Sequence, residues 1–214
     1  MVSASFAISA AVGGPITSRL VDRLGQNRLI PILLSLHVST LLITIFLIIK
    51  EANLILVLLL GVISGATVPT IGPFIRARWK KATNNKQQEN TAFAMESVID
   101  EVIFIFGPPL VTFLCVVLYD ASGLLLAAIL VTLGGIWLSG QKKTQPEVHI
   151  VGAEKGKAAL RYPGVFSLFL VYILLGAVFG AAEVIAVAFS REKGSPELAG
   201  ALITAWSVGS LAAG

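Results

Sequence analysis

Acidic side chains inside long apolar stretches are the residues of this sequence that could do chemistry. Glu96 and Asp100 are four residues apart, so on a helix they share one face, and Glu101 lies beside that face. Carboxylates in a membrane helix are costly and usually face a partner or water. These three could pair with Arg76, Arg78 or the polar stretch 18–28 as a gate network, or they could carry protons. We favour the gate network because they lie near a polar end of their segment.

Glu183 is the acidic residue that lies deepest in an apolar segment. It precedes Phe189, where we expect the segment to end, by six residues, or about 9 Å along a helix. A carboxylate at this depth could bind and release a proton. Alternatively, it is an ordinary solvated charge that faces an outer vestibule.

The other reactive residue types do not form a recognisable site. Two histidines and a single cysteine, Cys115, cannot build a metal centre or a disulfide within the chain. Neither a catalytic triad nor a phosphate-binding glycine loop is present. We therefore expect no enzymatic activity, no cofactor and no metal. His37 lies in an apolar segment, where it could relay protons or, as we favour, pack as a hydrogen-bonded side chain.

The elements that must position these residues are predicted to be membrane-spanning helices. Hydrophobic residues make up 56 % of the chain and charged residues only 13 %, against about 25 % charged in soluble domains. A helix needs about 20 apolar residues to span a bilayer. Successive apolar segments run over residues 2–17, 29–49, 54–75, 91–118, 123–139, 163–189 and 197–214. We therefore expect an all-α integral membrane protein with about seven transmembrane helices.

Two of these segments have unusual composition. Segment 2–17 is short for a span and rich in Ser, Ala and Gly, which let helix backbones approach closely in lipid. We therefore expect it to pack inside a bundle. Segment 54–75 contains Pro69 and Pro73, which remove backbone hydrogen bonds. This interrupted stretch could line a path through the bundle or serve helix packing alone.

Basic residues predict the orientation of the chain in the membrane. All but three of the 16 Lys and Arg residues lie in stretches 18–28, 76–90 and 140–162. Loops rich in Lys and Arg face the cytoplasm, so we expect these stretches, including a linker at 140–162, to be cytoplasmic. This placement accounts for the net charge of +4. We therefore expect the lipid bilayer as a partner and no nucleic acid.

The polar stretch 18–28 carries the most specific motif. It contains Asp22, Arg23, Gly25 and Arg28. Its D-R-x-G core resembles the cytoplasmic loop between helices 2 and 3 of major facilitator superfamily transporters. The family pattern is G-x-x-x-D-R-x-G followed by basic residues.

Two departures from that pattern are visible. Ser18 replaces the first glycine, and Gln26 and Asn27 stand where basic residues are common.

The resemblance implies that this loop controls alternating access. Gly25 would permit a tight turn, and Asp22 would accept hydrogen bonds from the N-terminus of a neighbouring helix. Arg23 and Arg28 would pair with carboxylates or lipid phosphates. Plain anchoring of the loop on the cytoplasmic side is the alternative.

The resemblance also implies an architecture of two six-helix halves joined by a cytoplasmic linker. Residues 1–139 would be an N-terminal half-bundle that lacks its first helix, and 163–214 the start of the C-terminal half. The chain would then correspond to helices 2–8 of twelve. Residues 6–14 and 206–214, both led by an aromatic residue and rich in small residues, are consistent with such a duplication.

The function implied by the resemblance is secondary active transport of a small solute across the plasma membrane. Since no ATP-binding segment is seen, protons are the expected coupling ion. Gly107 and Pro108 resemble the Gly-Pro element of an antiporter motif, which favours efflux. The alternatives are a non-transporting truncated remnant and a seven-helix receptor or membrane scaffold.

Overall fold

The structure is a computed structural model that describes residues 2–148, 163–195 and 197–213. Within these ranges all regular secondary structure is helical, which confirms the all-α prediction. Most of the linker predicted at 140–162 lies outside the described residues. The chain forms two compact units: unit 1 is Met1–Met95 with Ala121–Val151, and unit 2 is Glu96–Asp120 with Gly152–Gly214. The predicted division into half-bundles at 1–139 and 163–214 stays a prediction.

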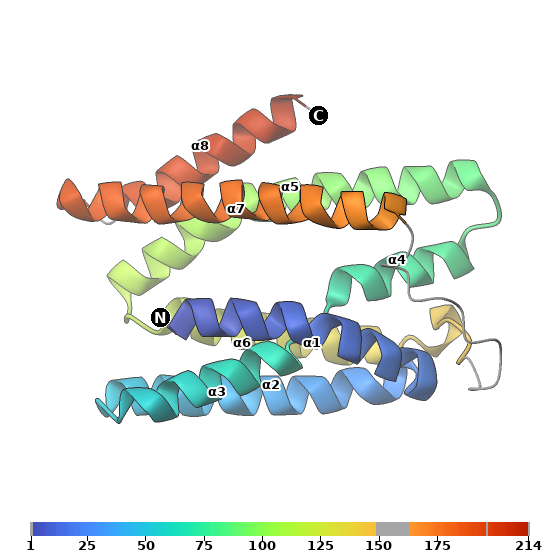
Figure 1. The fold of residues 1–214 in the computed structure, drawn as a ribbon, viewed down its shortest axis with the longest axis horizontal. Helices are drawn as coiled ribbons and strands as arrows, with labels where there is room; N and C mark the ends of the chain where they lie inside the picture. Colours follow the sequence, from blue (N-terminus) through green and yellow to red (C-terminus); the bar gives the residue numbers. More distant parts are fainter. Residues whose placement is uncertain (1, 149–162, 196, 214) are drawn as a thin grey trace. The chain divides into compact units, whose positions relative to one another are not determined.

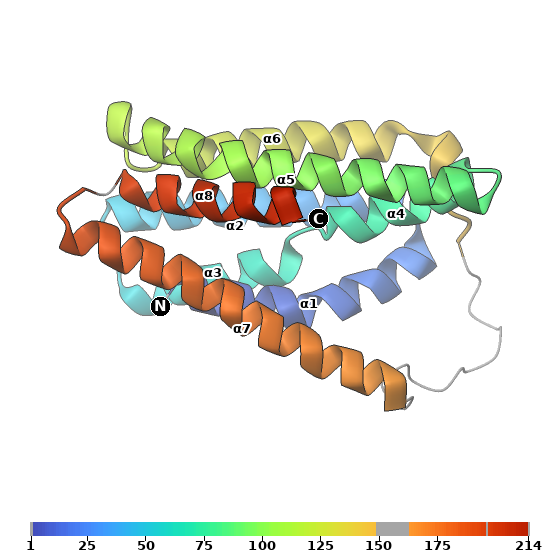
Figure 2. The ribbon, with the colours of Figure 1, turned by 90° about the horizontal axis from the view of Figure 1, so that it is seen from above.

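Unit 1 holds most of the helices (Figure 1). They are α1 (Val2–Leu24), α2 (Gln26–Ile49), α3 (Leu54–Thr67), α4 (Ile71–Ala82), α6 (Ser122–Gly140) and the short 3-10 helix η1 (Lys142–Thr144). Helix α5 (Lys86–Val117) begins in unit 1 and continues in unit 2. Unit 2 also contains α7 (Pro163–Glu192) and α8 (Leu198–Ala213), which a short turn connects (Figure 2).

These helices account for the seven predicted spans. Five stretches within the described residues are long and apolar enough to cross a membrane, namely α2, α3 with α4, α5, α6 and α7. Helix α8 is apolar but shorter, and α1 is 23 residues long. Helices α3 and α4 together form one interrupted span, because residues 68–70 between them are not helical.

The predicted loop at residues 18–28 is much shorter in the structure. Helix α1 continues to Leu24, and Gly25 alone separates it from α2. The expected end of the first helix at residue 17 is therefore wrong. Polar side chains do not interrupt the backbone hydrogen bonds of a helix when they point to solvent, and Arg19, Asp22 and Arg23 are all exposed.

Helices α1 and α3 lie side by side in both views (Figures 1 and 2) and approach closely. A Cβ atom at Gly13 would lie 2.6 Å from the carbonyl oxygen of Ala66, and one at Gly61 would lie 3.3 Å from the Ser5 hydroxyl. Such close approach depends on small residues. The structure thus confirms that the small residues of the first segment serve packing within a bundle.

The hydrophobic core of unit 1 joins α2, α4 and α6. Ile30 and Leu34 of α2 are buried against Phe74 of α4, and Val131 and Leu138 of α6 pack against them. Ile30 is fully buried. This core lies directly beneath the polar end at which α2 begins, and it fixes the three helices that position the candidate site.

In unit 2, helix α8 compensates for the prolines of α5. Pro109 has no N–H, so the Ile105 carbonyl one turn earlier loses its usual helical donor. The Thr204 hydroxyl of α8 donates to this carbonyl at 3.0 Å. Gly200 allows the approach, because a Cβ atom there would lie only 3.1 Å from the Thr112 hydroxyl of α5. Helix α5 therefore remains continuous through Pro108 and Pro109.

Candidate functional site

Arg78 of α4 is the centre of the polar end of unit 1, and only 5 % of it is exposed. Its Nε donates to Gln26 Oε1 at 2.6 Å, and its Nη2 donates to Asn27 Oδ1 at 3.1 Å. Its Nη1 donates to the Gln141 carbonyl at 2.6 Å and to Thr144 Oγ1 at 3.0 Å. A single guanidinium thus connects the start of α2, helix α4, the end of α6 and η1.

The guanidinium of Arg78 is held by neutral oxygens. Hydrogen bonds to a charged group are stronger than those between neutral groups, and four of them offset the cost of burying the cation. Gln26 is itself only 2 % exposed, and its Nε2 donates to the Phe74 carbonyl at 3.2 Å. The network is therefore continuous with the core below it.

Gly25 forms the turn between α1 and α2, and the segment after α6 packs against it. Its φ of 81° lies in the left-handed region that glycine favours. A Cβ atom would lie 2.7 Å from Gln145 Nε2 and 3.1 Å from Val148 Cγ2. The backbone N–H of Asn27 donates to Gln145 Oε1 at 3.0 Å, and Lys81 Nζ donates to the Gln145 backbone carbonyl at 2.7 Å. The backbone conformation therefore favours glycine here, and a Cβ atom would also displace the side chain of Gln145.

The charged residues of the D-R-x-G core separate into two pockets. Asp22 lines a pocket of about 200 Å³ that also includes Pro73 of α4 and Glu147. Arg23 and Arg28 line another pocket, of about 690 Å³. Asp22 is exposed, and its proposed acceptance of hydrogen bonds from a helix N-terminus stays a prediction.

The departures from the family pattern have a structural reason. Gln26 and Asn27, which replace basic residues, both accept hydrogen bonds from Arg78. A basic side chain at position 26 would remove an acceptor and place a second cation beside the guanidinium. The sequence alone predicts Arg78 only as a cytoplasmic charge and a possible partner of the α5 carboxylates. Two sequence features together could have predicted the network: an arginine, Arg78, after the interrupted span, and two amide residues, Gln26 and Asn27, directly after Gly25.

The interruption at residues 68–70 explains the position of His37. The Val68 amide bonds to Gly65 O at 3.3 Å, so the Ser64 carbonyl lacks its regular helical donor. His37 Nδ1 lies 2.9 Å from this carbonyl, which can only accept, so Nδ1 carries the proton. His37 is 6 % exposed. This geometry agrees with the favoured role in hydrogen-bonded packing.

The predicted carboxylates of α5 belong to unit 2. Glu96 is partly buried and Asp100 is exposed, while Glu101 Oε1 accepts a 3.1 Å hydrogen bond from the Ser210 hydroxyl of α8. This link between Glu101 and α8 was not foreseen. The pairing of Glu96, Asp100 and Glu101 with Arg76, Arg78 or the polar stretch 18–28 stays a prediction, as does their role in carrying protons.

Glu183 lies on an exposed part of α7. Apart from its own turn of α5, no atom of the described residues lies within 4 Å of where a Cβ would stand at Gly107. Pro108 lies at the contact with Gly200. In the interrupted span, Pro69 is buried and Pro73 is exposed. Their expected places along a transport path stay predictions.

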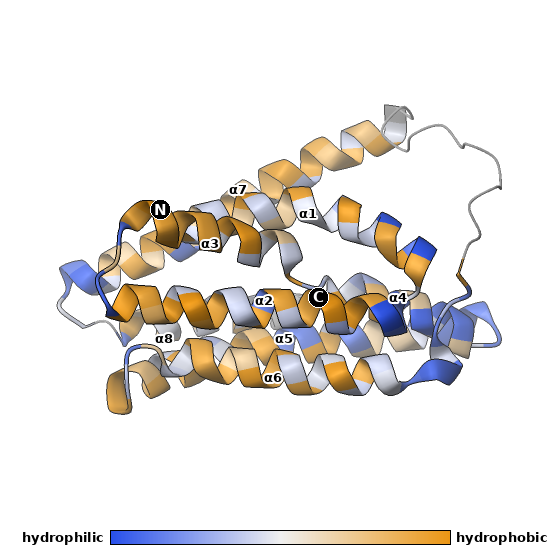
Figure 3. Ribbon diagram, turned by 90° about the horizontal axis from the view of Figure 1, so that it is seen from below, coloured by the Kyte–Doolittle hydropathy of each residue, from blue (hydrophilic) through white to orange (hydrophobic). Residues whose placement is uncertain are grey.

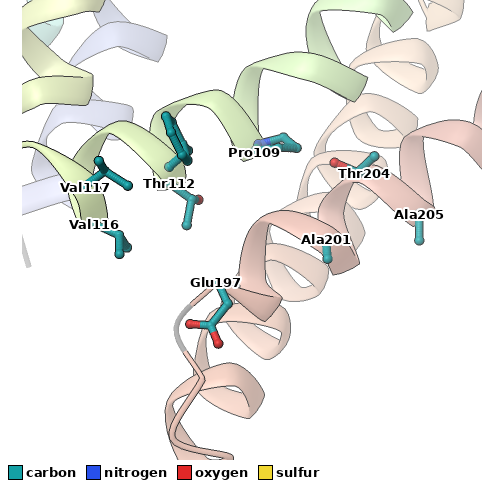
Figure 4. Close-up of a pocket in the computed structure, with 9 residues that line it drawn as sticks. Pro109, Thr112, Val116, Val117, Glu197, Ala201, Thr204 and Ala205 are labelled. Carbon is teal, nitrogen blue, oxygen red and sulfur yellow. The ribbon is translucent and has the colours of Figure 1, made fainter.

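A pocket of about 500 Å³ lies between α5 and α8 in unit 2 (Figure 4). Thr112 and Thr204 contribute hydroxyls and Glu197 contributes a carboxylate, while the rest of the lining is apolar. None of these three residues was singled out from the sequence. Their polarity is common in helices, and only the fold brings them together.

Comparison with known proteins identifies the family but no individual relative. No curated protein and no solved structure matches the chain. The model of the Major Facilitator Superfamily matches residues 1–214. The match covers every helix described above, including the Gly25 turn and the Arg78 network. The chain belongs to the Major Facilitator Superfamily, and it is a membrane transporter sequence of that family.

Proposed function

We propose that this sequence serves secondary active transport of a small solute by alternating access, coupled to protons and directed outward across the plasma membrane. The observation that carries the proposal is the Arg78 network at the Gly25 turn. Alternating access moves one half of a transporter largely as a rigid unit against the other. A buried cation with four hydrogen bonds makes the start of α2, helix α4 and the end of α6 move together.

In this proposal the exposed face of the turn forms the cytoplasmic gate. Asp22 and Arg23 are exposed, while the side chains of Gln145 and Val148 lie close to Gly25. A rigid base with charged groups on its surface can make ionic contacts that form in one state and break in the other. Arg28 would contribute to the same surface.

The carboxylates of unit 2 are the proposed proton carriers or gate partners. Glu96, Asp100 and Glu101 follow one another along α5, and Glu183 lies on α7. Intramembrane carboxylates commonly serve proton relays in transporters. The interrupted span with Pro69 and Pro73 is the proposed wall of the solute path, because irregular backbone in membranes is tolerated where it lines a cavity.

The test is gradient-driven transport in liposomes that contain the full chain. Radiolabelled sugars, amino acids and organic cations would be tested as a panel at an imposed pH difference. We expect at least one solute to accumulate against its own gradient and to be released when a protonophore collapses the pH difference. Accumulation of no solute in the panel would support the non-transporting remnant.

Variants then locate the coupling. Glu183→Gln is expected to abolish uphill transport while leaving exchange of solute across the membrane intact. Unchanged uphill transport in this variant would exclude Glu183 as the coupling residue. Glu192→Gln, at the end of the same helix, is the matched control and should transport normally.

A further inference from the structure

The pocket between α5 and α8 has no role in the function proposed above. It lies within unit 2, and its volume is about 500 Å³, a size common among small-molecule sites. We call it the unit 2 pocket. Apart from Glu197, Thr112 and Thr204, its lining is apolar and consists of Pro109, Phe113, Val116, Val117, Ala201 and Ala205. The unit 2 pocket can therefore take up an apolar group of a small molecule.

The polar groups of the unit 2 pocket mostly accept hydrogen bonds. The Thr204 hydroxyl donates its proton to the Ile105 carbonyl at 3.0 Å, so its oxygen is left as an acceptor. Glu197 stands directly before α8 (Figure 4), and its carboxylate accepts when it is ionised. The Thr112 hydroxyl faces α8, because a Cβ atom at Gly200 would lie 3.1 Å from its Oγ1. These groups suit a ligand that donates hydrogen bonds.

Glu197 carries a charge that the surrounding residues do not neutralise. Among the described residues that line the unit 2 pocket there is no Lys, Arg or His. Arg191 and Lys193 lie close by in the sequence, but in the described ranges neither forms an ion pair with Glu197. Instead, Lys193 Nζ lies 5.6 Å from the centre of the Phe189 ring. Since opposite charges attract more strongly beside an apolar wall than in bulk water, a cation at Glu197 would be stabilised.

The charge stands at one end of the unit 2 pocket. Helix α7 is apolar along most of its length and hydrophilic where it ends (Figure 3), and the turn that follows leads to Glu197. Few basic residues lie at this end, so the positive-inside rule predicts that it faces outward. Gly200 and Thr204 follow Glu197 by three and seven residues, about 4.5 and 10 Å along a helix. The Thr112 hydroxyl beside Gly200 therefore lies less than one turn of α8 from Glu197, and the apolar lining continues beyond it.

We propose that the unit 2 pocket binds an amphiphilic primary amine in its ammonium form. The ammonium group has three N–H donors and donates to the Glu197 carboxylate and the Thr112 hydroxyl. The apolar body lies between α5 and α8, toward Thr204. An aminophospholipid also carries an ammonium group, but its phosphate would find no cation among the described lining residues, so a free amine fits better. The site does not depend on the transport proposal.

The experiment measures binding of radiolabelled n-octylamine to the full chain in phosphatidylcholine nanodiscs by equilibrium dialysis. Binding to empty nanodiscs is subtracted. We expect saturable binding of one molecule per chain. Octanol has the same alkyl chain without a charge and octanoate carries the opposite charge, so each should compete more weakly than octylamine by about fivefold or more. Octanol or octanoate competing as well as octylamine itself would overturn the proposal.

Two variants with the same loss of charge separate the unit 2 pocket from general attraction. Glu197→Gln should weaken octylamine binding roughly fivefold, the effect of one partly exposed ion pair. Glu192→Gln removes a carboxylate from the exposed end of α7 outside the pocket and should weaken binding less than about twofold, because solvent screens its charge. Equal effects of the two variants, or unchanged binding in Glu197→Gln, would contradict the assignment of the ammonium group to Glu197.

A third variant and a second lipid test the apolar body and the source of the amine. Ala201→Phe fills the unit 2 pocket with a ring and should abolish saturable binding. Ala201 is exposed, so this variant should keep the helical circular dichroism of the original chain. Unchanged binding in Ala201→Phe would place the amine elsewhere and overturn the site. Phosphatidylethanolamine nanodiscs should support the same octylamine binding, and loss of binding there would overturn the free amine as the occupant.

Discussion

Replacing Arg78 with alanine should destabilise unit 1 more than any other single change at its polar end. The side chain makes four hydrogen bonds. At roughly 1.5–3 kcal/mol for each bond to a charged group, their gross contribution is roughly 6–12 kcal/mol. Burying the guanidinium costs several kcal/mol in return. We expect a net loss of about 3–5 kcal/mol once this cost is subtracted from the gross contribution.

The assay is thermal unfolding of the purified protein in detergent, followed by tryptophan fluorescence with Trp206 of unit 2 replaced by Phe in every variant, so that only Trp79 and Trp137 report. Both tryptophans line a groove of unit 1 that also includes Arg78, so they report on the affected region. A loss of this size should lower the Tm by roughly 6–20 °C. The matched control is Lys80→Ala, on the same helix but exposed, which should change the stability by less than about 0.5 kcal/mol.

Arg78→Lys distinguishes the shape of the guanidinium from its charge. An ammonium has three donors and no planar fork, so at least one of the four acceptors loses its donor. We expect about half the destabilisation of Arg78→Ala. If Arg78→Ala were no less stable than Lys80→Ala, the reasoning that the network holds the polar end together would be refuted.

Further substitutions test the other local arguments. Gly25→Ala should cost about 1–3 kcal/mol because Gly25 has a positive φ and a Cβ atom there would meet Gln145. The Tm of this variant should fall further than that of Gly194→Ala, because Gly194 also has a positive φ but nothing lies within 4 Å of a Cβ atom there. Thr204→Val should cost about 1–3 kcal/mol because the Ile105 carbonyl loses its donor, and Thr204→Ser should restore the Tm; equal Tm values for the Val and Ser variants would contradict this assignment. His37→Leu should cost about 1 kcal/mol, because the Ser64 carbonyl loses its 2.9 Å partner and keeps only the longer 3.3 Å bond from the Thr67 hydroxyl. His37→Asn, which keeps a donor, should cost less in the same assay.

The fold was largely predictable because hydrophobicity determines membrane helices. The apolar segments, the small residues of the first helix and the interruption near Pro69 were all visible in the sequence. The end of α1 was not, because Arg19, Asp22 and Arg23 stay helical while facing solvent. The end of a helix is set by where its backbone hydrogen bonds stop, and exposed polar side chains do not mark that position.

Only those parts of the candidate site that depend on neighbouring residues in the sequence were predictable. Gly25 could be assigned to a turn from its neighbours alone. The role of Arg78 could not, because its acceptors lie 51 to 66 residues away along the chain. For the same reason, the bond from Thr204 to Ile105, which spans 99 residues, and the link from His37 to Ser64 appear only in the folded structure.

The central claim is that Gln26 and Arg78 act as a pair that takes the place of a basic residue after the glycine. A double-mutant cycle of Gln26→Arg, Arg78→Gln and the combined swap measures this directly through the free energy of unfolding. Gln26→Arg places two guanidinium groups beside one another, and Arg78→Gln leaves two amides without a cation. The combined swap again pairs a guanidinium with an amide. We predict that the swap is more stable than the sum of the single losses by about 1–3 kcal/mol. Additive losses, with no coupling between the two positions, would contradict the account.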